Sequence, residues 1–163
     1  RSNSPEMREA ALRVPKSESE TARNILLKDK FGEKNRYRMA VLLKLNDLLG
    51  RAVVRVEPGE ATCEHILPQS VGPDSPWAKL FRTPNGKRYN GWRWANSLGN
   101  LTLLSPADNI AAADAAYRIK RPILKKSGFA LSRDAARTSK WSQRAIESRT
   151  THFVSLLQQH WEL

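Results

Sequence analysis

The sequence of 163 residues is long enough for one domain with a buried hydrophobic core. Its 28 Lys and Arg residues outnumber 16 Asp and Glu residues, so the net charge is +12 and indicates a polyanionic partner, most often a nucleic acid. The single cysteine, Cys63, excludes a disulfide framework and a zinc site built from paired cysteines. No apolar run approaches the roughly 20 residues that cross a bilayer, which excludes a membrane-spanning chain.

The first part of the chain is predicted to support the fold rather than to carry chemistry. Residues 1–18 are polar, and we expect them to form a linker or lead-in. Residues 19–52 are predicted to be a helical support segment, with helical apolar spacing from about 20 to 31 and from about 35 to 49. Because the chain starts with Arg1 and not with Met, we expect it to be the C-terminal part of a longer protein.

The pattern changes to short strands in residues 53–122, which we predict to be the core. A β-branched run at 53–56 is typical of a strand, and so is the segment 62–66 that follows a Pro-Gly turn. Residues 101–104, Leu-Thr-Leu-Leu, predict another short strand.

A helix is predicted directly after this last strand. Ser105 is a good N-cap residue and Pro106 suits the first helical position. Ile110 belongs to the expected buried stripe, and Pro122 predicts the end of the helix by about Lys120.

Residues 123–163 are predicted to be a C-terminal helical segment packed on the core, with one amphipathic helix from 141 to 161. The irregular stretch 70–98 contains three tryptophans, Trp77, Trp92 and Trp94. We expect them to fold onto the core, with base stacking as the less favoured alternative. Together these elements predict a single, mostly helical α+β domain.

The sharpest motif is Glu64-His65-Ile66-Leu67-Pro68, at the end of a predicted strand. Alone it is weak, because a histidine beside a carboxylate is more often an ordinary packing or surface pair. A second half follows in the chain, with Asn100 at the head of the next strand and Asn109 in the first turn of the capped helix. The combination is much more specific than any one of its elements.

This order of parts resembles the HNH, or ββα-metal, nucleases. The segments EHILPQS, LGNLTLL and YRIKRPIL, together with the final helix, resemble the C-terminal nuclease domain of GmrSD-type, modification-dependent (type IV) restriction enzymes and related DNA-defence proteins. The resemblance covers about residues 35–163. It implies a β-hairpin and a helix that clasp one divalent metal, Mg²⁺ or Mn²⁺, wrapped by additional helices. It also implies a DNA endonuclease of the bacterial cytoplasm, served by an N-terminal nucleotide-using and sensing domain in the same chain or a partner subunit.

The resemblance implies a role for each residue of the motif. Glu64 and Asn109 would hold the metal, His65 would be the general base, and Asn100 would be a latch that orients the histidine loop. An imidazole with an ordinary pKa of about 6.5 suits a base at neutral pH. Asn100 is nearly as well explained as a turn residue after glycine. Adjacent residues of a strand point to opposite faces, so Glu64 and His65 can face one ligand only where the strand ends or bulges.

Two stretches without any acidic residue, 79–93 and 115–133, predict a groove that follows the phosphate backbone of DNA. Residues Lys120 and Arg121 match the family's Lys-Arg pair and are candidate phosphate clamps. Arg149 is expected either to bind phosphate or to brace the acidic site. Arg88 and Arg93 are weaker candidates that rest on their charge alone.

Two alternatives to a DNA endonuclease stay open. A non-catalytic, basic DNA-binding module would need only positive charge and aromatic residues, although it would have no use for the Glu-His…Asn…Asn set. An RNA-directed nuclease would use the same site and the same chemistry.

Overall fold

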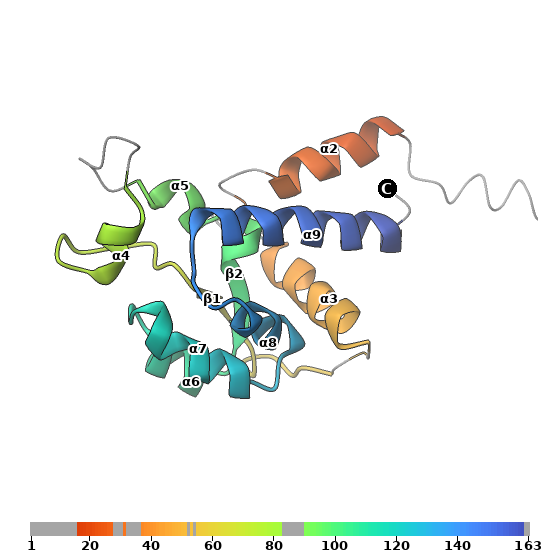
Figure 1. The fold of residues 1–163 in the computed structure, drawn as a ribbon. Helices are drawn as coiled ribbons and strands as arrows, with labels where there is room; N and C mark the ends of the chain where they lie inside the picture. The colour runs from red at the N-terminus through yellow and green to blue at the C-terminus, as the bar shows by residue number, and fades with distance from the viewer. Residues whose placement is uncertain are drawn as a thin grey trace, which may run out of the picture.

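The computed structural model describes residues 16–27, 31, 37–51, 53, 55–82 and 90–161, and it is a mostly helical α+β fold (Figure 1). A two-stranded antiparallel sheet lies among the helices. In chain order the elements are α2 (Lys16–Leu27), α3 (Arg38–Gly50), β1 (Thr62–His65), α4 (Pro76–Leu80), α5 (Trp92–Ala95), the 3₁₀ turn η1 (Leu98–Asn100), β2 (Leu101–Leu104), α6 (Pro106–Ala112), α7 (Tyr117–Lys126), α8 (Ala130–Arg137) and α9 (Gln143–Trp161). None of the described helices combines the length and the apolar character that crossing a bilayer requires.

The hairpin of β1 and β2 confirms the two strands predicted at 62–66 and 101–104. The strands pair in antiparallel register, with Glu64 opposite Thr102 and His65 opposite Leu101. The first strand ends at His65, and the next amide, that of Ile66, donates to the carbonyl oxygen of Asn100 at 3.1 Å. The β-branched run at 53–56 forms no strand at its described positions 53, 55 and 56.

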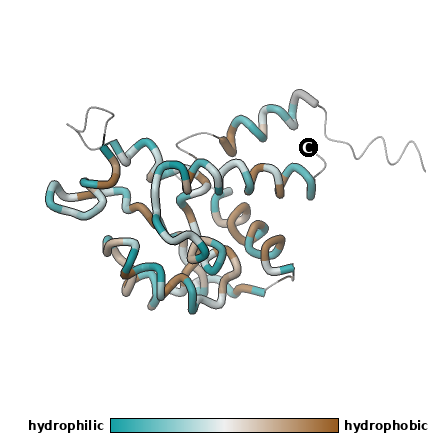
Figure 2. Tube along the Cα trace, viewed as in Figure 1, coloured by the Kyte–Doolittle hydropathy of each residue, from teal (hydrophilic) through white to brown (hydrophobic). Residues whose placement is uncertain are grey.

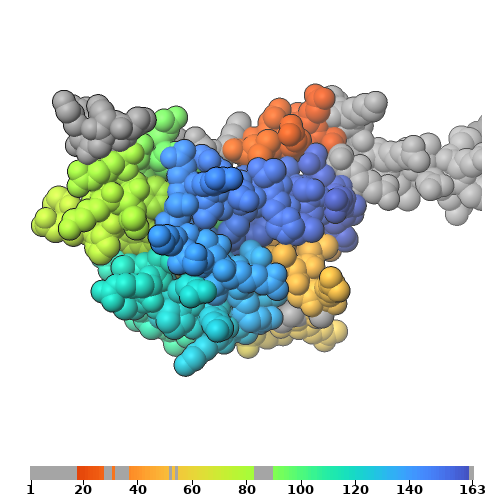
Figure 3. All heavy atoms as spheres, viewed as in Figure 1, coloured from red at the N-terminus to blue at the C-terminus, as the bar shows by residue number. Residues whose placement is uncertain are grey.

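The hairpin separates two apolar clusters. Leu101 and Leu103 of β2 pack in a cluster with α2, α3, α8 and α9, whereas Leu104 packs in a cluster with α4, α5, α6 and α7. Helix α9 contributes to both clusters, with Ile146 in one and Phe153 in the other. The hydropathy view (Figure 2) shows that α3 carries many apolar residues, as expected of a supporting helix. In the space-filling view (Figure 3), atoms of α8 and α9 cover the middle of the face that is drawn.

The single helix predicted from Pro106 to Lys120 is wrong, because the structure has two helices there. Helix α6 ends at Ala112, and Ala113 has φ +38°, which interrupts helical geometry. The interruption is stabilised by the buried indole of Trp77, whose Nε1 donates to the carbonyl oxygens of Asp114 at 3.3 Å and Ala115 at 3.1 Å.

Two details of that predicted helix are wrong as well. Ile110 is 80 % exposed and does not belong to a buried stripe. Pro122 lies inside α7 and does not end it, since α7 continues to Lys126. Pro122 is exposed, and there the loss of one helical hydrogen bond costs least. The predicted helix from 141 to 161 is confirmed by α9, which begins two residues later.

We expect Gly99→Ala to destabilise the fold by at least about 2 kcal/mol, because overpacking forces backbone to move. A Cβ atom at Gly99 would lie 2.1 Å from the carbonyl oxygen of Ile146 and 2.5 Å from Oγ1 of Thr150. Urea unfolding measures the change. The matched control is Gly72→Ala, where a Cβ atom meets nothing within 4 Å and the change should stay below about 1 kcal/mol. Equal effects of the two substitutions would contradict the close approach of η1 to α9.

Candidate functional site

The two faces of the hairpin carry different halves of the predicted motif. Glu64 and Thr62 alternate with Cys63 and His65 along β1, so the Glu64 carboxylate and the His65 imidazole leave opposite faces. The strand continues without a bulge and ends at His65. Adjacent side chains can face one ligand only where a strand ends or bulges, and the imidazole stands at the end of this strand.

Glu64 is 5 % exposed, and its partner is a lysine of α7. Nζ of Lys120 lies 2.5 Å from Oε1 of Glu64 and 3.0 Å from the carbonyl oxygen of His65. Burial raises the pKa of the Glu64 carboxyl, and the ammonium opposes that shift. Burial likewise lowers the pKa of Lys120, and the carboxylate opposes it. The two groups form a buried ion pair that ties α7 to the strand.

The predicted phosphate clamp at Lys120 does not fit this position. Its side chain is 0 % exposed and its ammonium lies against Glu64, so no DNA phosphate can reach it in this structure. The neighbouring Arg121 is half-buried, and its Nε donates to the carbonyl oxygen of Ala136 at 2.9 Å.

Asn109 lies on the same face of the hairpin as Glu64. Its Nδ2 donates to Oγ1 of Thr62 at 2.7 Å, and that hydroxyl donates to the carbonyl oxygen of Leu104 at 3.0 Å. The first turn of α6 is fixed by Ser105, whose Oγ accepts from the amide of Asp108 at 3.1 Å, as the sequence predicts. The side-chain nitrogen of Asn109 is thus bonded to the strand, and the side-chain oxygen, Oδ1, is the atom that remains for a ligand.

The donors on this face fit a hard divalent cation. A carboxylate and a carboxamide oxygen are ligands that Mg²⁺ and Mn²⁺ accept, with water and phosphate oxygens completing the shell. Among the described residues, no group of three or more His, Cys, Asp and Glu side chains could hold a metal ion. The two donors on this face are Glu64 and Asn109, and the Lys120 ammonium already contacts one oxygen of the carboxylate.

His65 is oriented by a residue that the sequence analysis missed. Its Nε2 lies 3.1 Å from Oδ1 of Asn96, and Nε2 of Gln69 donates to the same oxygen at 2.8 Å. Because a carboxamide oxygen only accepts, Nε2 of His65 carries the proton and Nδ1 keeps the lone pair. Asn96 follows the short helix α5 and stands at no motif spacing, so only its polarity among tryptophans could have drawn attention.

The imidazole of His65 is held in its neutral form. Burial lowers the pKa of His65 to about 4, and the positive charges of Arg38 and Lys120 act in the same direction. At neutral pH the ring is therefore unprotonated at Nδ1, and this nitrogen is a weaker base than that of an ordinary imidazole.

Asn100 is fully buried and joins three segments around His65. Its Oδ1 accepts from the amide of Leu67 at 2.8 Å and from Nε1 of Trp141 at 3.0 Å. Its Nδ2 donates to the carbonyl oxygens of Leu67 at 2.9 Å and Ala95 at 2.8 Å. Asn100 thus holds the loop after His65 against α5 and against the start of the C-terminal segment, which is more than a turn asparagine would do.

Arg149 is buried and does not face solvent. Its guanidinium pairs with Asp134 at 3.2 Å, donates to the carbonyl oxygen of Gly99, and lies 4.6 Å from the ring centroid of Phe153. Of the two roles expected for it, phosphate binding does not fit this burial. Bracing fits, although the group that it braces is the Gly99–Asn100 turn and not the acidic site.

The remaining basic candidates lie at the surface or outside the described residues, and one of the three tryptophans is exposed. Arg93 is exposed at α5, with its guanidinium carbon 5.9 Å from the ring centroid of Trp94. Trp92, in the same helix, is 62 % exposed, whereas Trp77 and Trp94 are buried. Arg88 lies outside the described residues.

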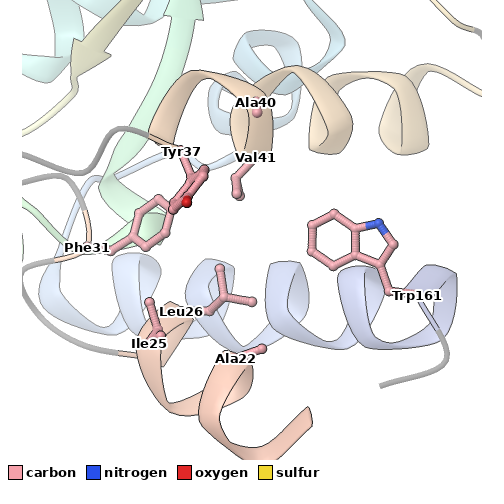
Figure 4. Close-up of a pocket in the computed structure, with 8 residues that line it drawn as sticks. All are labelled: Ala22, Ile25, Leu26, Phe31, Tyr37, Ala40, Val41 and Trp161. Atoms are coloured by element: carbon pink, nitrogen blue, oxygen red, sulfur yellow. The ribbon is translucent and has the colours of Figure 1, made fainter. Parts of the chain in front are cut away.

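An apolar hollow of about 430 Å³ lies between α2, α3 and the end of α9 (Figure 4). Its lining includes Leu26, Phe31 and Trp161, and none of the predicted site residues. It offers too few polar groups to bind a phosphate, so the chemistry suggested by the motif belongs to the hairpin.

Comparison with known proteins identifies a family. The family model described as "GmrSD restriction endonucleases, C-terminal domain" matches residues 15–156, which include both strands and all the residues discussed at the hairpin. No curated protein and no solved structure matches the chain.

We expect His65 to stay neutral down to about pH 5, since its pKa is lowered to about 4. For an imidazole with an ordinary pKa of about 6.5, the neutral fraction would fall about tenfold between about pH 7.5 and about pH 5.5. Nitrogen NMR of the imidazole rings measures the titration, with His65→Gln to assign the signal. A midpoint near 6.5 for His65 would show that the ring is hydrated and not held as described.

Proposed function

Because the chain belongs to the C-terminal domain family of the GmrSD restriction endonucleases, we propose that it is the metal-dependent, DNA-cutting domain of such an enzyme. The observation that carries the proposal is the arrangement at the end of β1. A neutral histidine, oriented through Nε2, stands at the end of β1, and a carboxylate and a carboxamide share one face of the hairpin. Selection of modified DNA would lie in an N-terminal, nucleotide-using domain of the same protein or a partner subunit.

In this proposal His65 is the general base. Nδ1 takes a proton from a water molecule, which then attacks the phosphorus of the scissile phosphodiester. Asn96 keeps Nε2 protonated, so the lone pair that accepts the proton is on Nδ1. Asn100 contributes by position, since it fixes the loop that follows His65. By family likeness, the products carry 5′-phosphate and 3′-hydroxyl ends.

The acidic face of the hairpin would hold the cation. Glu64 and Asn109 are the donors for one Mg²⁺ or Mn²⁺, which when bound offsets the phosphate charge and stabilises the leaving 3′ oxygen. Thr62 orients the Asn109 carboxamide so that its oxygen is the free end.

We propose that DNA lies along the exposed side of α5. Arg93 and Trp92 are exposed there, and α5 leads directly to Asn96, the partner of His65. An arginine can contact the backbone phosphate, and an exposed indole can stack on a base or sugar. Arg121 is a further candidate for a phosphate contact, because it is only half-buried, although its Nε donates to the carbonyl oxygen of Ala136.

We expect His65→Ala to lower the rate of DNA cleavage by about 10²–10⁴-fold, because the base is lost while the fold and DNA binding are kept. Relaxation of supercoiled plasmid in Mg²⁺ measures it. The matched control is His152→Ala, an exposed histidine of α9 that should leave the rate unchanged. Equal nicking by wild type and His65→Ala would remove the assignment.

EDTA should abolish cleavage, and added Mg²⁺ or Mn²⁺ should restore it, since the donors are hard oxygen atoms. The same assay with plasmid and with a matched RNA separates the alternatives. Binding without strand breaks would favour the non-catalytic module, and preferential cleavage of RNA would favour the RNA-directed nuclease. Cleavage that persists without metal would contradict the proposed site.

We expect Arg93→Ala to weaken DNA binding and to reduce the slope of log K against log salt by about one, as for the loss of one phosphate contact. Trp92→Ala should weaken binding by about fivefold or more without reducing that slope, since stacking carries no charge. Fluorescence anisotropy with labelled DNA measures both. Arg23→Ala, an exposed arginine of α2, is the control. An Arg93→Ala protein that binds like this control would place the DNA elsewhere.

A further inference from the structure

Lys120 is an unusual lysine, because its whole side chain is buried. Lysine is among the residues least often fully buried, and a buried ammonium group needs a hydrogen-bonding or charged partner. Here the partners are Oε1 of Glu64 at 2.5 Å and the carbonyl oxygen of His65 at 3.0 Å. The ammonium of Lys120 therefore contacts both residues of the Glu-His motif: the carboxylate of Glu64 and the backbone carbonyl of His65.

The helix that carries Lys120 is fixed on both sides of it. The Tyr117 hydroxyl donates to the carbonyl oxygens of Ala135 and Thr138, each at 2.8 Å. One residue beyond Lys120, Nε of Arg121 donates to the carbonyl oxygen of Ala136 at 2.9 Å. These contacts hold α7 against α8, so the ammonium is positioned at Glu64 by the fold and not by a mobile side chain.

A positive charge at this place answers a specific need. A carboxylate that is buried alone would be strongly destabilising, and a carboxylate used to bind a cation is alone whenever the cation is absent. A neutral hydrogen-bond donor would satisfy the oxygen atom but leave the negative charge uncompensated.

We propose that Lys120 is the resident counter-ion of Glu64: its ammonium neutralises the carboxylate when no divalent cation is bound, and it competes with that cation. The inference rests on the proposed function, since it takes Glu64 as a metal donor. Lys120 is then a positioning residue, which acts through Glu64 and touches neither DNA nor the reacting atoms.

The competition follows from Coulomb's law. A cation that binds Glu64 must share the carboxylate with an ammonium or displace it, and two like charges within a few ångströms repel strongly in a buried site. The Lys120 charge therefore weakens binding of the free cation, and a negatively charged DNA phosphate brought to the site would offset that repulsion. Metal binding and DNA binding should reinforce each other.

The test measures Mn²⁺ affinity of the DNA-free protein by isothermal titration and by Mn²⁺ EPR, so that activity is not the readout. We expect Lys120→Met to bind Mn²⁺ about tenfold or more tightly than wild type, because a nearby like charge is removed. Lys120→Arg keeps the charge and should stay within about threefold of wild type. Glu64→Gln and the double variant Glu64→Gln/Lys120→Met should lose the binding.

The outcomes separate this inference from the proposed function. If wild type binds Mn²⁺ but Lys120→Met binds it equally or less tightly, the counter-ion role is wrong and the proposed metal site stands. If neither protein binds Mn²⁺, both proposals are wrong.

A failure of Lys120→Met to fold is also informative. Under the counter-ion role Mn²⁺ must restore its folding, and the double variant, with no charge left in the pair, must fold without metal. A Lys120→Met protein that Mn²⁺ cannot restore would overturn the inference.

Discussion

The geometry around the hairpin depends on one buried carboxamide, that of Asn100. It accepts from the amide of Leu67 and from the indole of Trp141, and it donates to the carbonyl oxygens of Leu67 and Ala95. These three partner residues belong to three separate segments of the chain. Asn96, which orients His65, directly follows Ala95, so the residue that fixes the loop also fixes the partner of the imidazole. A buried amide with all its bonds made specifies position more sharply than apolar packing does.

The predicted site residues lie on two different faces of the hairpin, because successive side chains of a strand point to opposite faces. One face presents Glu64 and, through Thr62, Asn109, while His65 leaves the other face at the point where β1 ends. The burial that lowers the pKa of His65 also raises that of Glu64, since low polarity disfavours any charged group. The same environment therefore keeps a base neutral and makes a carboxylate dependent on a counter-ion.

Local signals in the sequence predicted the elements that carry the motif. The strand at 62–65 was predicted after a Pro-Gly turn, the strand at 101–104 from its leucine run, and the Ser105-Pro106 start of α6 from capping chemistry. The break at Ala113 was missed because it depends on Trp77, a residue more than thirty positions earlier in the chain. The place of Lys120 was missed for a related reason, since a lysine in a basic run is normally at the surface. Likewise, Asn96 reaches His65 only through the folding of α5 onto the hairpin. Contacts between distant segments decide these positions, and no local pattern encodes them.

The burial of Lys120 and Arg149 changes how the charge of the protein acts at a distance. Each cation is matched inside by one anion, Glu64 or Asp134, so each pair is electrically neutral to an approaching polyanion. The excess of +12 is therefore carried entirely by the other ionisable side chains. Long-range attraction, which speeds encounter and fades as ionic strength rises, is consequently a property of the periphery. The interior pairs can be retuned by selection without altering how fast the domain finds a nucleic acid.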